Sequence, residues 1–376
     1  MAMRKHTLFL SLLLGLTVLG SESVPSLQDD WFDKWVLLQQ RWYKKDAELV
    51  AAEAKRVNNE IDPTNDLGGE NGYYTTISES IANIPDNSTK RYTLILKAGT
   101  VFREKVFLNR SKPFVTLKSD PTNPATIVWN DTATTLGKDG KPLGNVGSST
   151  VTIESDYFTA YNVIFKNDAP KGQASALRVS GTKATFYNST IEGGQGALYD
   201  QKGLHYFKAC TIKGTVDFIF GLAKSLYEDC NIVSVNKDIT AVSTAPPQQP
   251  LAGKKKKPLA GKPVKVAGKE SGFSFKNCTI NGDGQQIYLG RVSGGSPVVY
   301  SFSEIGKEIV PISWARRKIQ KPESGIYYGD FKCYGPGFDA IKKASRSLAL
   351  TEAQAKPFIG TSFISGDSWI LDLPSS

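Results

Sequence analysis

The chain has 376 residues, 40% of them hydrophobic, which is enough to bury a large core. Its formal charge of +10 comes largely from seven lysines between positions 254 and 269, so the charge describes one loop and does not indicate a nucleic-acid-binding surface. The two histidines are His6 and His205, which makes a Ser-His-Asp site, a Cys-His site or a histidine-rich metal site hard to build, and leaves hydrolytic chemistry to carboxylates.

The N-terminal residues 1–20 are typical of a secretory signal peptide. Arg4 and Lys5 precede an apolar run from Leu8 to Leu19, and small residues follow it. The run is shorter than the roughly 20 residues that a membrane-spanning helix needs. Five Asn-X-Ser/Thr sequons fit passage through a glycosylating secretory pathway, although a chain of this length contains some by chance; they begin at Asn87, Asn109, Asn130, Asn188 and Asn277.

Two helices are predicted before the first strand. Residues 29–43 place Trp31, Trp35, Leu38 and Trp42 at helical spacing, which indicates an amphipathic helix packed on the main body or, less simply, on a partner.

The second helix is predicted to begin after Thr76, because Thr76 and Glu79 form a capping-box pair. Ile77, Ile81 and Ile84 make its apolar stripe, and Pro85 ends it. We expect this helix to cap one end of the structure that follows.

From residue 92 onward the pattern changes to short strands, which read YTLIL, FVTLKS, ATIVWN and STVTIES. A short phrase then recurs, mostly with an aromatic residue two or three positions earlier. Its copies begin at Asn162, Ser189, Cys210, Cys230, Cys278 and Ser303, at spacings of 27, 21, 20, 48 and 25. The value 48 fits either two periods or one period with an insertion.

A period of twenty-odd residues built on short strands indicates a solenoid whose isoleucines stack inside as a ladder. The simplest architecture is all-β, a single-stranded right-handed parallel β-helix with short capping helices at its ends. Polar and glycine-rich runs after residue 326, a helix near Thr351 and a tail with Trp369 are expected to close the far end.

The repeat places Cys210, Cys230 and Cys278 in one column. Strands of adjacent coils lie about 4.8 Å apart, within the range of disulfide Cα separations. Three candidates in one column leave the pairing open, and Cys333 is left over.

Residues 246–269 form a low-complexity stretch in which Ala-Gly-Lys occurs three times. It is predicted to be a loop, with two readings left open: a solvated insertion of no specific role, or an electrostatic tether for a polyanion.

Residues 215–221 resemble a strand, and alternation would put Val216, Phe218 and Phe220 on one face and Thr215, Asp217 and Ile219 on the other. Aspartate is disfavoured in strands, so Asp217 requires an explanation, although a lone aspartate is more often a surface residue.

Several segments resemble, in order and spacing, the motifs of plant pectin methylesterases: GQASALR (172–178), ALYDQKGLHYF (197–207), GTVDFIFG (214–221), YLGR (288–291) and YYGDFKCYGPG (327–337). The resemblance covers roughly residues 65–372. It implies a right-handed β-helix that hydrolyses methyl esters of homogalacturonan in the cell wall without a cofactor or metal, in agreement with the ladder.

The resemblance also implies roles for four residues. Asp217 matches the nucleophile that attacks the ester carbonyl, and Arg291 matches the arginine that keeps it ionised and oriented. Gln173 and Gln195 match the glutamines that stabilise the oxyanion.

Two positions depart from the family pattern. Gly196 stands where the family has the aspartate that acts as general acid and then base, and Ser293 stands where it has a tryptophan that lines the sugar groove. Because a positioned acid contributes about 10² to 10⁴-fold, its loss predicts a crippled enzyme. Asp200, four residues further on, is a poor substitute, since the family's own LYD segment carries it without using it.

The sequence thus predicts a signal peptide (1–20), an N-terminal helical extension (21–64) and a pectinesterase-like β-helix domain (65–376) containing the lysine-rich loop at 246–269. The expected function is that of a secreted, extracellular, monomeric pectin methylesterase of the cell wall, with weak activity. Its expected partners are homogalacturonan and a proteinaceous inhibitor, without nucleic acid or membrane.

One alternative is a catalytically inactive pectin-binding protein that uses the same groove and the lysine-rich loop. A pectate lyase or polygalacturonase fits less well, because the motifs match neither and no clustered carboxylates suggest a calcium site.

Overall fold

The structure, a computed structural model, describes residues 74–235, 240–241, 271–283, 287–291, 297–310, 314–315, 328–344 and 348–370. The signal peptide (1–20), the N-terminal extension (21–64) with its helix at 29–43, the lysine-rich loop (246–269) and Ser293 lie outside these ranges. No helix in the described ranges is long and apolar enough to cross a membrane.

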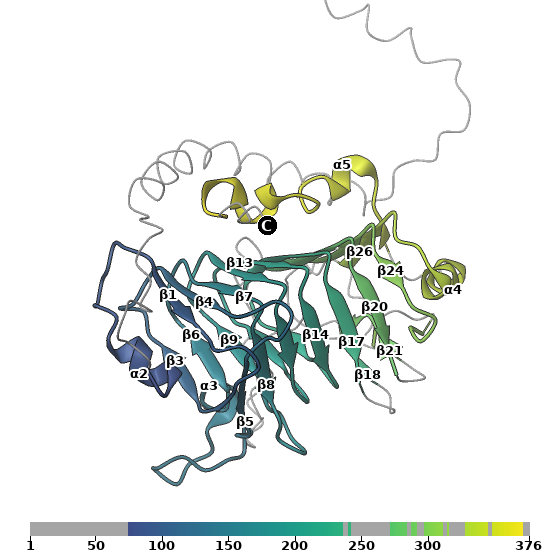
Figure 1. Cartoon of the computed structure of the whole chain (residues 1–376). Helices are drawn as coiled ribbons and strands as arrows, with labels where there is room; N and C mark the ends of the chain where they lie inside the picture. The colour runs from purple at the N-terminus through teal and green to yellow at the C-terminus, as the bar shows by residue number, and fades with distance from the viewer. Residues whose placement is uncertain are drawn as a thin grey trace, which may run out of the picture.

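Three parallel sheets wind around one axis, and successive strands of the chain pass from one sheet to the next (Figure 1). Sheet A contains, in spatial order, β1 (Tyr92–Ile95), β4 (Val115–Lys118), β7 (Thr159–Tyr161), β10 (Ala184–Tyr187), β13 (Leu204–Lys208), β16 (Lys224–Glu228), β19 (Gly272–Lys276), β23 (Val298–Ser301), β26 (Tyr328–Phe331) and β27 (Leu348–Ala349). Sheet B contains β2 (Val101–Arg103), β5 (Thr126–Trp129), β8 (Ile164–Asn167), β11 (Thr190–Glu192), β14 (Thr211–Gly214), β17 (Asn231–Ser234), β20 (Thr279–Gly282) and β24 (Glu304–Ile305). Sheet C contains β3 (Val106–Leu108), β6 (Val151–Ile153), β9 (Leu177–Val179), β12 (Leu198–Asp200) and β15 (Ile219–Phe220).

Two further parallel pairs consist of very short strands. They are β18 (Thr240–Ala241) with β21 (Ile287–Tyr288), and β22 (Gly290–Arg291) with β25 (Trp314–Ala315). The fold is therefore the right-handed parallel β-helix that the repeat predicts.

The isoleucine ladder lies inside sheet B. Ile191, Ile212, Ile232, Ile280 and Ile305 occupy equivalent positions on successive strands, and each is at most 1% exposed. The spacing of 48 is one coil with an insertion, because β17 pairs directly with β20 and β16 with β19.

The first copy of the predicted repeat is displaced by one residue. Thr190 pairs with Ile164 and Ile191 with Phe165, so Phe165 and not Ile164 belongs to the ladder. The turn between sheets A and B explains the true register. One residue per coil adopts a left-handed backbone there, with φ between 44° and 58°: Asn162, Asn188, Ala209, Asp229, Asn277, Phe302 and Lys332. Asn162 therefore aligns with Asn188.

The residue after each left-handed position points into the core. This column contains Ser189, Cys210, Cys230, Cys278 and Ser303, and Cys333 joins it one coil further on. All four cysteines are buried free thiols, so the structure contains no disulfide in the column. Burial raises the pKa of the Cys210 thiol, and also that of Cys278.

Helix α2 (Ile77–Ala82) packs beside β3 at the N-terminal end, as predicted, with Ile77 and Ile81 buried. The Thr76 side chain accepts from the Glu79 backbone N–H at 3.1 Å. The Glu79 carboxylate accepts from the Thr75 hydroxyl at 3.2 Å, and the Glu104 carboxylate accepts from the backbone N–H of Ile77 at 2.7 Å.

Closure at the far end differs from the prediction. Residues 328–331 form β26 and extend sheet A, and α4 (Pro336–Ala344) packs at the end of the β-helix beside β24. Helix α5 (Glu352–Ala355) begins after Thr351 with a capping box, as expected. It leads to the 3₁₀ turns η3 (Thr361–Ile364) and η4 (Gly366–Ser368), and this segment lies over the outer face of sheet A (Figure 1).

Candidate active site

Three successive coils bring Gln173, Gln195 and Asp217 to the same edge of sheet C. Gln173 and Gln195 form a parallel bridge, and the backbone N–H of Ala174 donates to the Gln195 carbonyl at 2.9 Å. The N–H of Gly196 in turn donates to the Val216 carbonyl at 3.1 Å. As whole residues, Gln173, Gln195 and Asp217 are partly exposed, while Oδ1 of Asp217 is buried.

The predicted alternation of residues 215–221 is wrong. The segment turns from sheet B to sheet C, and Asp217 occupies this turn with φ 47°. Phe218 and Ile219 both belong to the main hydrophobic core, so these consecutive side chains do not alternate between its inside and outside. Aspartate and asparagine tolerate left-handed backbone better than other side chains, and residues held in such conformations cluster at functional sites.

Both glycines that flank this turn are required by close packing. A Cβ atom on Gly214 would lie 2.2 Å from Cβ of Phe218, and one on Gly221 would lie 1.7 Å from the Asp200 carbonyl oxygen. The GTVDFIFG motif thus encodes a tight turn that presents Asp217.

Gly196 occupies the position next to this turn with φ 71°. A Cβ atom there would lie 2.9 Å from Cε1 of Phe220 and 3.3 Å from Nε2 of Gln173. The position adjoins both the Phe220 ring and the Gln173 amide, and the glycine leaves it without an acid.

Asp200 does not replace the missing acid, as the sequence predicts. Its side chain is fully buried, His205 Nδ1 contacts one carboxylate oxygen, and the Tyr227 hydroxyl donates to the other at 2.7 Å. His205 Nε2 donates to the Gly181 carbonyl at 2.7 Å. Burial and then the nearby Asp200 raise the pKa of Tyr227, which therefore remains a neutral donor. This network belongs to the core.

A row of side chains crosses the outer face of sheet C, and three of its members lie within the family motifs without a role assigned to them. In register from β3 to β15 it contains Phe107, Thr152, Arg178, Tyr199 and Phe220. The rings of Tyr199 and Phe220 are stacked with centroids 4.4 Å apart. Alternation within LYD would have placed Tyr199 on this face, whereas FIF does not alternate, because Phe218 lies in the core.

Arg178 lies at the centre of this row. Its Nε donates to Gln201 at 2.7 Å and its Nη1 to Glu154 at 3.1 Å, so the guanidinium is held in place. Arg178, Tyr199 and Phe220 are only 3 to 7% exposed, so these side chains are packed against their surroundings and present little open surface to a ligand.

Arg291 lies on β22, where it pairs with Ala315. Its side chain is outside the described part of the chain, so the predicted contact with Asp217 stays a prediction. Within the described ranges, no group of three His, Cys, Asp or Glu side chains is arranged to hold a metal ion.

Comparisons with known proteins identify the family of the chain. The family model described as Pectinesterase matches residues 67–367. Pectinesterase QRT1 of Arabidopsis thaliana is 37% identical over 308 residues, which cover 80% of this chain and 76% of that protein. Pectinesterase 2 of Olea europaea is 34% identical over 355 residues, which cover 91% and 88%.

Solved structures give the same result. The pectin methylesterase from carrot superposes with a TM-score of 0.64 at 28% identity, covering 81% of this chain and 93% of that one. PemA from Erwinia chrysanthemi reaches a TM-score of 0.66 at 24% identity, covering 82% and 98%, which supports the fold alone. Because the family model spans most of the chain and curated relatives exceed 30% identity over most of its length, the chain belongs to the pectinesterase family.

Proposed function

We propose that the protein is a carboxylic ester hydrolase that removes methyl groups from methyl-esterified homogalacturonan. The observation that carries this proposal is the alignment of Gln173, Gln195 and Asp217 at one edge of sheet C, on three adjacent coils. Family membership supports the same reaction.

In the proposed mechanism, the Asp217 carboxylate attacks the ester carbonyl carbon. The Gln173 and Gln195 side-chain amides donate to the developing oxyanion, and Arg291 keeps Asp217 ionised. Collapse of the tetrahedral intermediate breaks the bond to the methoxy oxygen, which leaves as methanol after gaining a proton. Water then hydrolyses the acyl-aspartate anhydride, releasing the galacturonate and restoring Asp217.

Because Gly196 carries no acid, protonation of the methoxy oxygen becomes the difficult step of this mechanism. A carboxylate leaves a tetrahedral intermediate far more readily than methoxide, so without a donor most intermediates return to the ester. We propose that solvent water supplies the proton, which makes turnover slow. The rate should then depend steeply on the acidity of the leaving alcohol.

We further propose that the protein acts outside the cell, in the cell wall, as a monomer that a proteinaceous inhibitor can bind. The signal-peptide pattern at 1–20 supports secretion. A related pectin methylesterase, 24% identical, has been solved in complex with a hexasaccharide, which supports an oligogalacturonide as ligand here.

Methanol release from highly methylated pectin tests the function, with wild-type protein beside Asp217→Asn. Asparagine has the same size and tolerates the left-handed backbone of residue 217, so the fold should persist while the nucleophile is lost. We expect slow release by the wild type and a loss of at least about 10³-fold in the variant.

Two outcomes would oppose the proposal. An Asp217→Asn variant that keeps the wild-type rate would exclude Asp217 as the nucleophile. A wild type that releases no methanol, yet is retarded by polygalacturonate in affinity electrophoresis, would support the binding protein that Gly196 favours.

Trifluoroethyl esters test for the missing acid, because trifluoroethanol is a better leaving group than methanol and needs less protonation. The wild type should cleave them much faster than methyl esters.

A further inference from the structure

The inner face of sheet A carries a ladder of stacked aromatic rings. Phe186, Phe207, Tyr227, Phe275 and Tyr300 follow one another on five adjacent strands, with centroids of neighbouring rings 4.6 to 4.7 Å apart. Stacking explains five aromatic rings but not the hydroxyl groups on two of them. Because a buried hydroxyl needs a partner, each of the two tyrosines has a further contact to account for.

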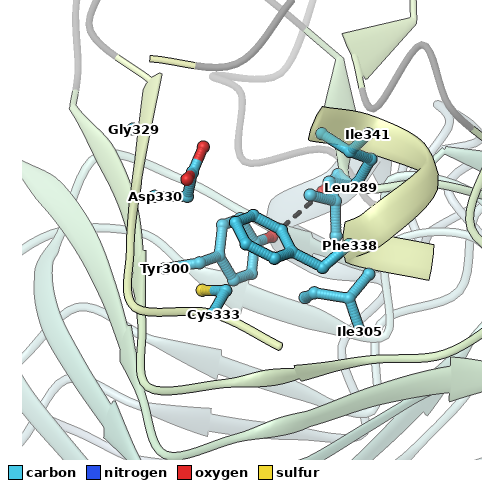
Figure 2. Close-up of a pocket in the computed structure, with 8 residues that line it drawn as sticks. All are labelled: Leu289, Tyr300, Ile305, Gly329, Asp330, Cys333, Phe338 and Ile341. Carbon is cyan, nitrogen blue, oxygen red and sulfur yellow. Dashed lines mark hydrogen bonds between the residues drawn. The ribbon is translucent and has the colours of Figure 1, made fainter. Parts of the chain in front are cut away.

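The Tyr300 side chain extends through the core, and its hydroxyl reaches a backbone carbonyl two residues before Arg291. It donates to the Leu289 carbonyl at 3.0 Å (Figure 2). Tyr300 is 1% exposed and Leu289 is 4% exposed, so water does not compete for this bond. Leu289 stands between β21 and β22, two residues before Arg291.

Packing on the other side of this contact is incomplete. A cavity of about 10 Å³ adjoins Tyr300 and Leu289, too small for a sugar. Its remaining lining residues are Ile305, Gly329, Asp330, Cys333, Phe338 and Ile341 (Figure 2). Leu289 is packed in the core as well, so the hydrogen bond adds a directional restraint to apolar contacts that have no direction.

We propose that Tyr300 is a positioning residue for Arg291, acting through the Leu289 carbonyl to fix where β22 begins. This inference rests on the proposed role of Arg291 in keeping Asp217 ionised. A side chain two residues from an anchored carbonyl moves with it, and a shift of about 1 Å at a catalytic group can cost about 10²-fold in rate.

Tyr300→Phe tests the role, since it keeps the ring and its stacking on Phe275 and removes a single oxygen. We expect kcat/KM for pectin methyl esters to fall roughly 10- to 100-fold. The acidic limb of the kcat/KM profile should also move to higher pH, because a carboxylate further from its arginine takes up a proton at a higher pH. A role in stability alone would not move this limb.

Tyr227→Phe is the matched control. It removes an equally buried hydroxyl from the same ladder, one that donates to Asp200 and not to the strand before Arg291. We expect this variant to lose stability but to keep the acidic limb of the wild type. A Tyr300→Phe limb at the wild-type pH, or equal shifts in both variants, would overturn the positioning role.

Arg291→Lys separates failure of this inference from failure of the proposed function. A wild type without methanol release, or an Arg291→Lys variant whose acidic limb does not move, would overturn the proposed role of Arg291 and Tyr300's role with it. If Arg291→Lys moves the limb and Tyr300→Phe does not, only the inference about Tyr300 falls.

Discussion

Gly196 is the residue at which this chain differs most from what its proposed chemistry needs. Its backbone is left-handed, and a Cβ atom there would lie next to Phe220 and Gln173. Aspartate is one of the few residues that accept such a backbone, at a cost of about 1 kcal/mol. The tip of the Phe220 ring must shift slightly to admit it.

Gly196→Asp should therefore raise kcat for methyl esters, by about 10² to 10⁴-fold if the carboxylic acid reaches the methoxy oxygen. Methanol release under saturating pectin measures this. The gain should be much smaller with trifluoroethyl esters, because their leaving group needs less protonation.

The matched control is Gly196→Asn, which has the same size and backbone tolerance but donates no acidic proton. An Asn variant that gains as much as the Asp variant would show that filling the space, and not acid catalysis, limits the natural protein.

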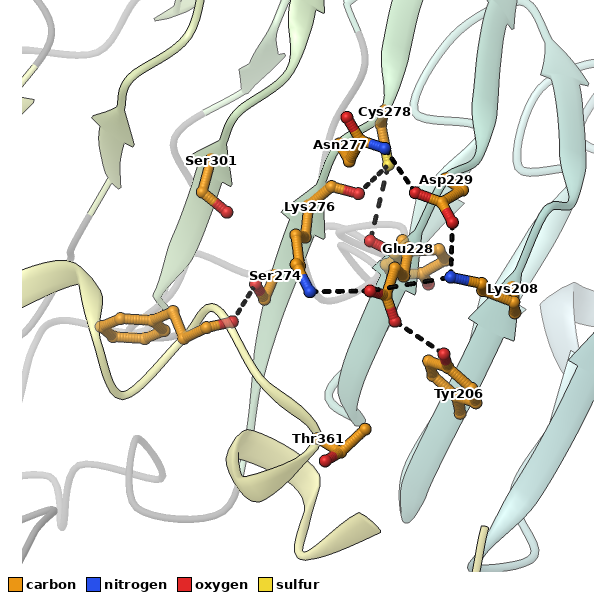
Figure 3. A network of polar contacts seen from close by, with 12 residues as sticks. Tyr206, Lys208, Glu228, Asp229, Ser274, Lys276, Asn277, Cys278, Ser301 and Thr361 are labelled. Carbon is orange, nitrogen blue, oxygen red and sulfur yellow. Dashed lines mark hydrogen bonds and ion pairs between the residues drawn. The ribbon is translucent and has the colours of Figure 1, made fainter. Parts of the chain in front are cut away.

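At the scale of elements, an ionic network joins three strands of sheet A. Glu228 on β16 accepts from Lys276 on β19 at 2.7 Å and from the Tyr206 hydroxyl on β13 at 2.6 Å (Figure 3). Lys208 on β13 contacts both Glu228 and Asp229, and Asn277 donates to Asp229 at 2.6 Å. The network therefore ties neighbouring coils together through side chains as well as through backbone ladders.

This network should make the free energy of unfolding depend on pH. Burial raises the pKa of Glu228, but bonds from Lys276 and Tyr206 outweigh it and hold the pKa below the usual 4.5. A lowered folded-state pKa contributes stability that is fully present above about pH 4.5 and is lost as pH falls through the lowered value. We expect Tm to fall with pH in this range.

Glu228→Gln should lower the free energy of unfolding by about 1 to 3 kcal/mol at pH 7 and flatten the dependence of Tm on pH below 4.5. Glu192→Gln is the control, since its ion pair with Lys166 also joins adjacent coils but is about one-third exposed on both sides. That change should stay within about 0.5 kcal/mol of wild type. Equal losses in the two variants would show that burial does not set the strength of these pairs.

For the molecule as a whole, the C-terminal segment 351–370 acts as a cover for sheet A. Phe358, Phe363 and Trp369 are each at most 4% exposed. The Ser274 hydroxyl donates to the Phe358 carbonyl at 2.6 Å, which fastens the segment to β19. The candidate site lies on sheet C, a different side of each coil, so the cover stabilises the fold without forming the site.

Trp369→Ala should therefore cost about 3 to 5 kcal/mol in the free energy of unfolding while leaving methanol release per folded molecule unchanged. Chemical denaturation followed by circular dichroism measures the first quantity, and initial rates well below Tm measure the second. Lower specific activity in fully folded protein would mean that the cover also shapes the site.

The sequence is sufficient to predict the architecture, because an inward isoleucine recurs once per coil while the residues around it differ from one copy of the repeat to the next. It was insufficient for the first register, since Ile164 imitates a ladder residue that is in fact Phe165. The left-handed turn positions are the better guide, and aligning Asn162 with Asn188 would have given the true pairing.

The sequence predicts the candidate site as a set of residues, of which the structure brings Gln173, Gln195 and Asp217 to one edge of sheet C, but it does not predict the geometry. Nothing in an apolar run such as VDFIF distinguishes a strand from a tight turn, and the packing that forces the turn at Asp217 involves Gly214 and Gly221. The glycosylation sequons are a second case in which a sequence pattern does not reveal its physical cause. Asn188 and Asn277 stand where the turn favours asparagine and a threonine begins the next strand, so backbone geometry alone produces two of the five motifs.

The long interval between β17 and β19 has a consequence for how such a chain can grow. Because the strands on either side of it pair in register, extra sequence enters there without adding a coil or shifting a ladder. Loop-closure entropy rises only logarithmically, by about 0.6 kcal/mol for each doubling of length. Evolution can therefore lengthen or replace this interval at a small cost in folding free energy. A protein engineer can insert a foreign domain at the same point.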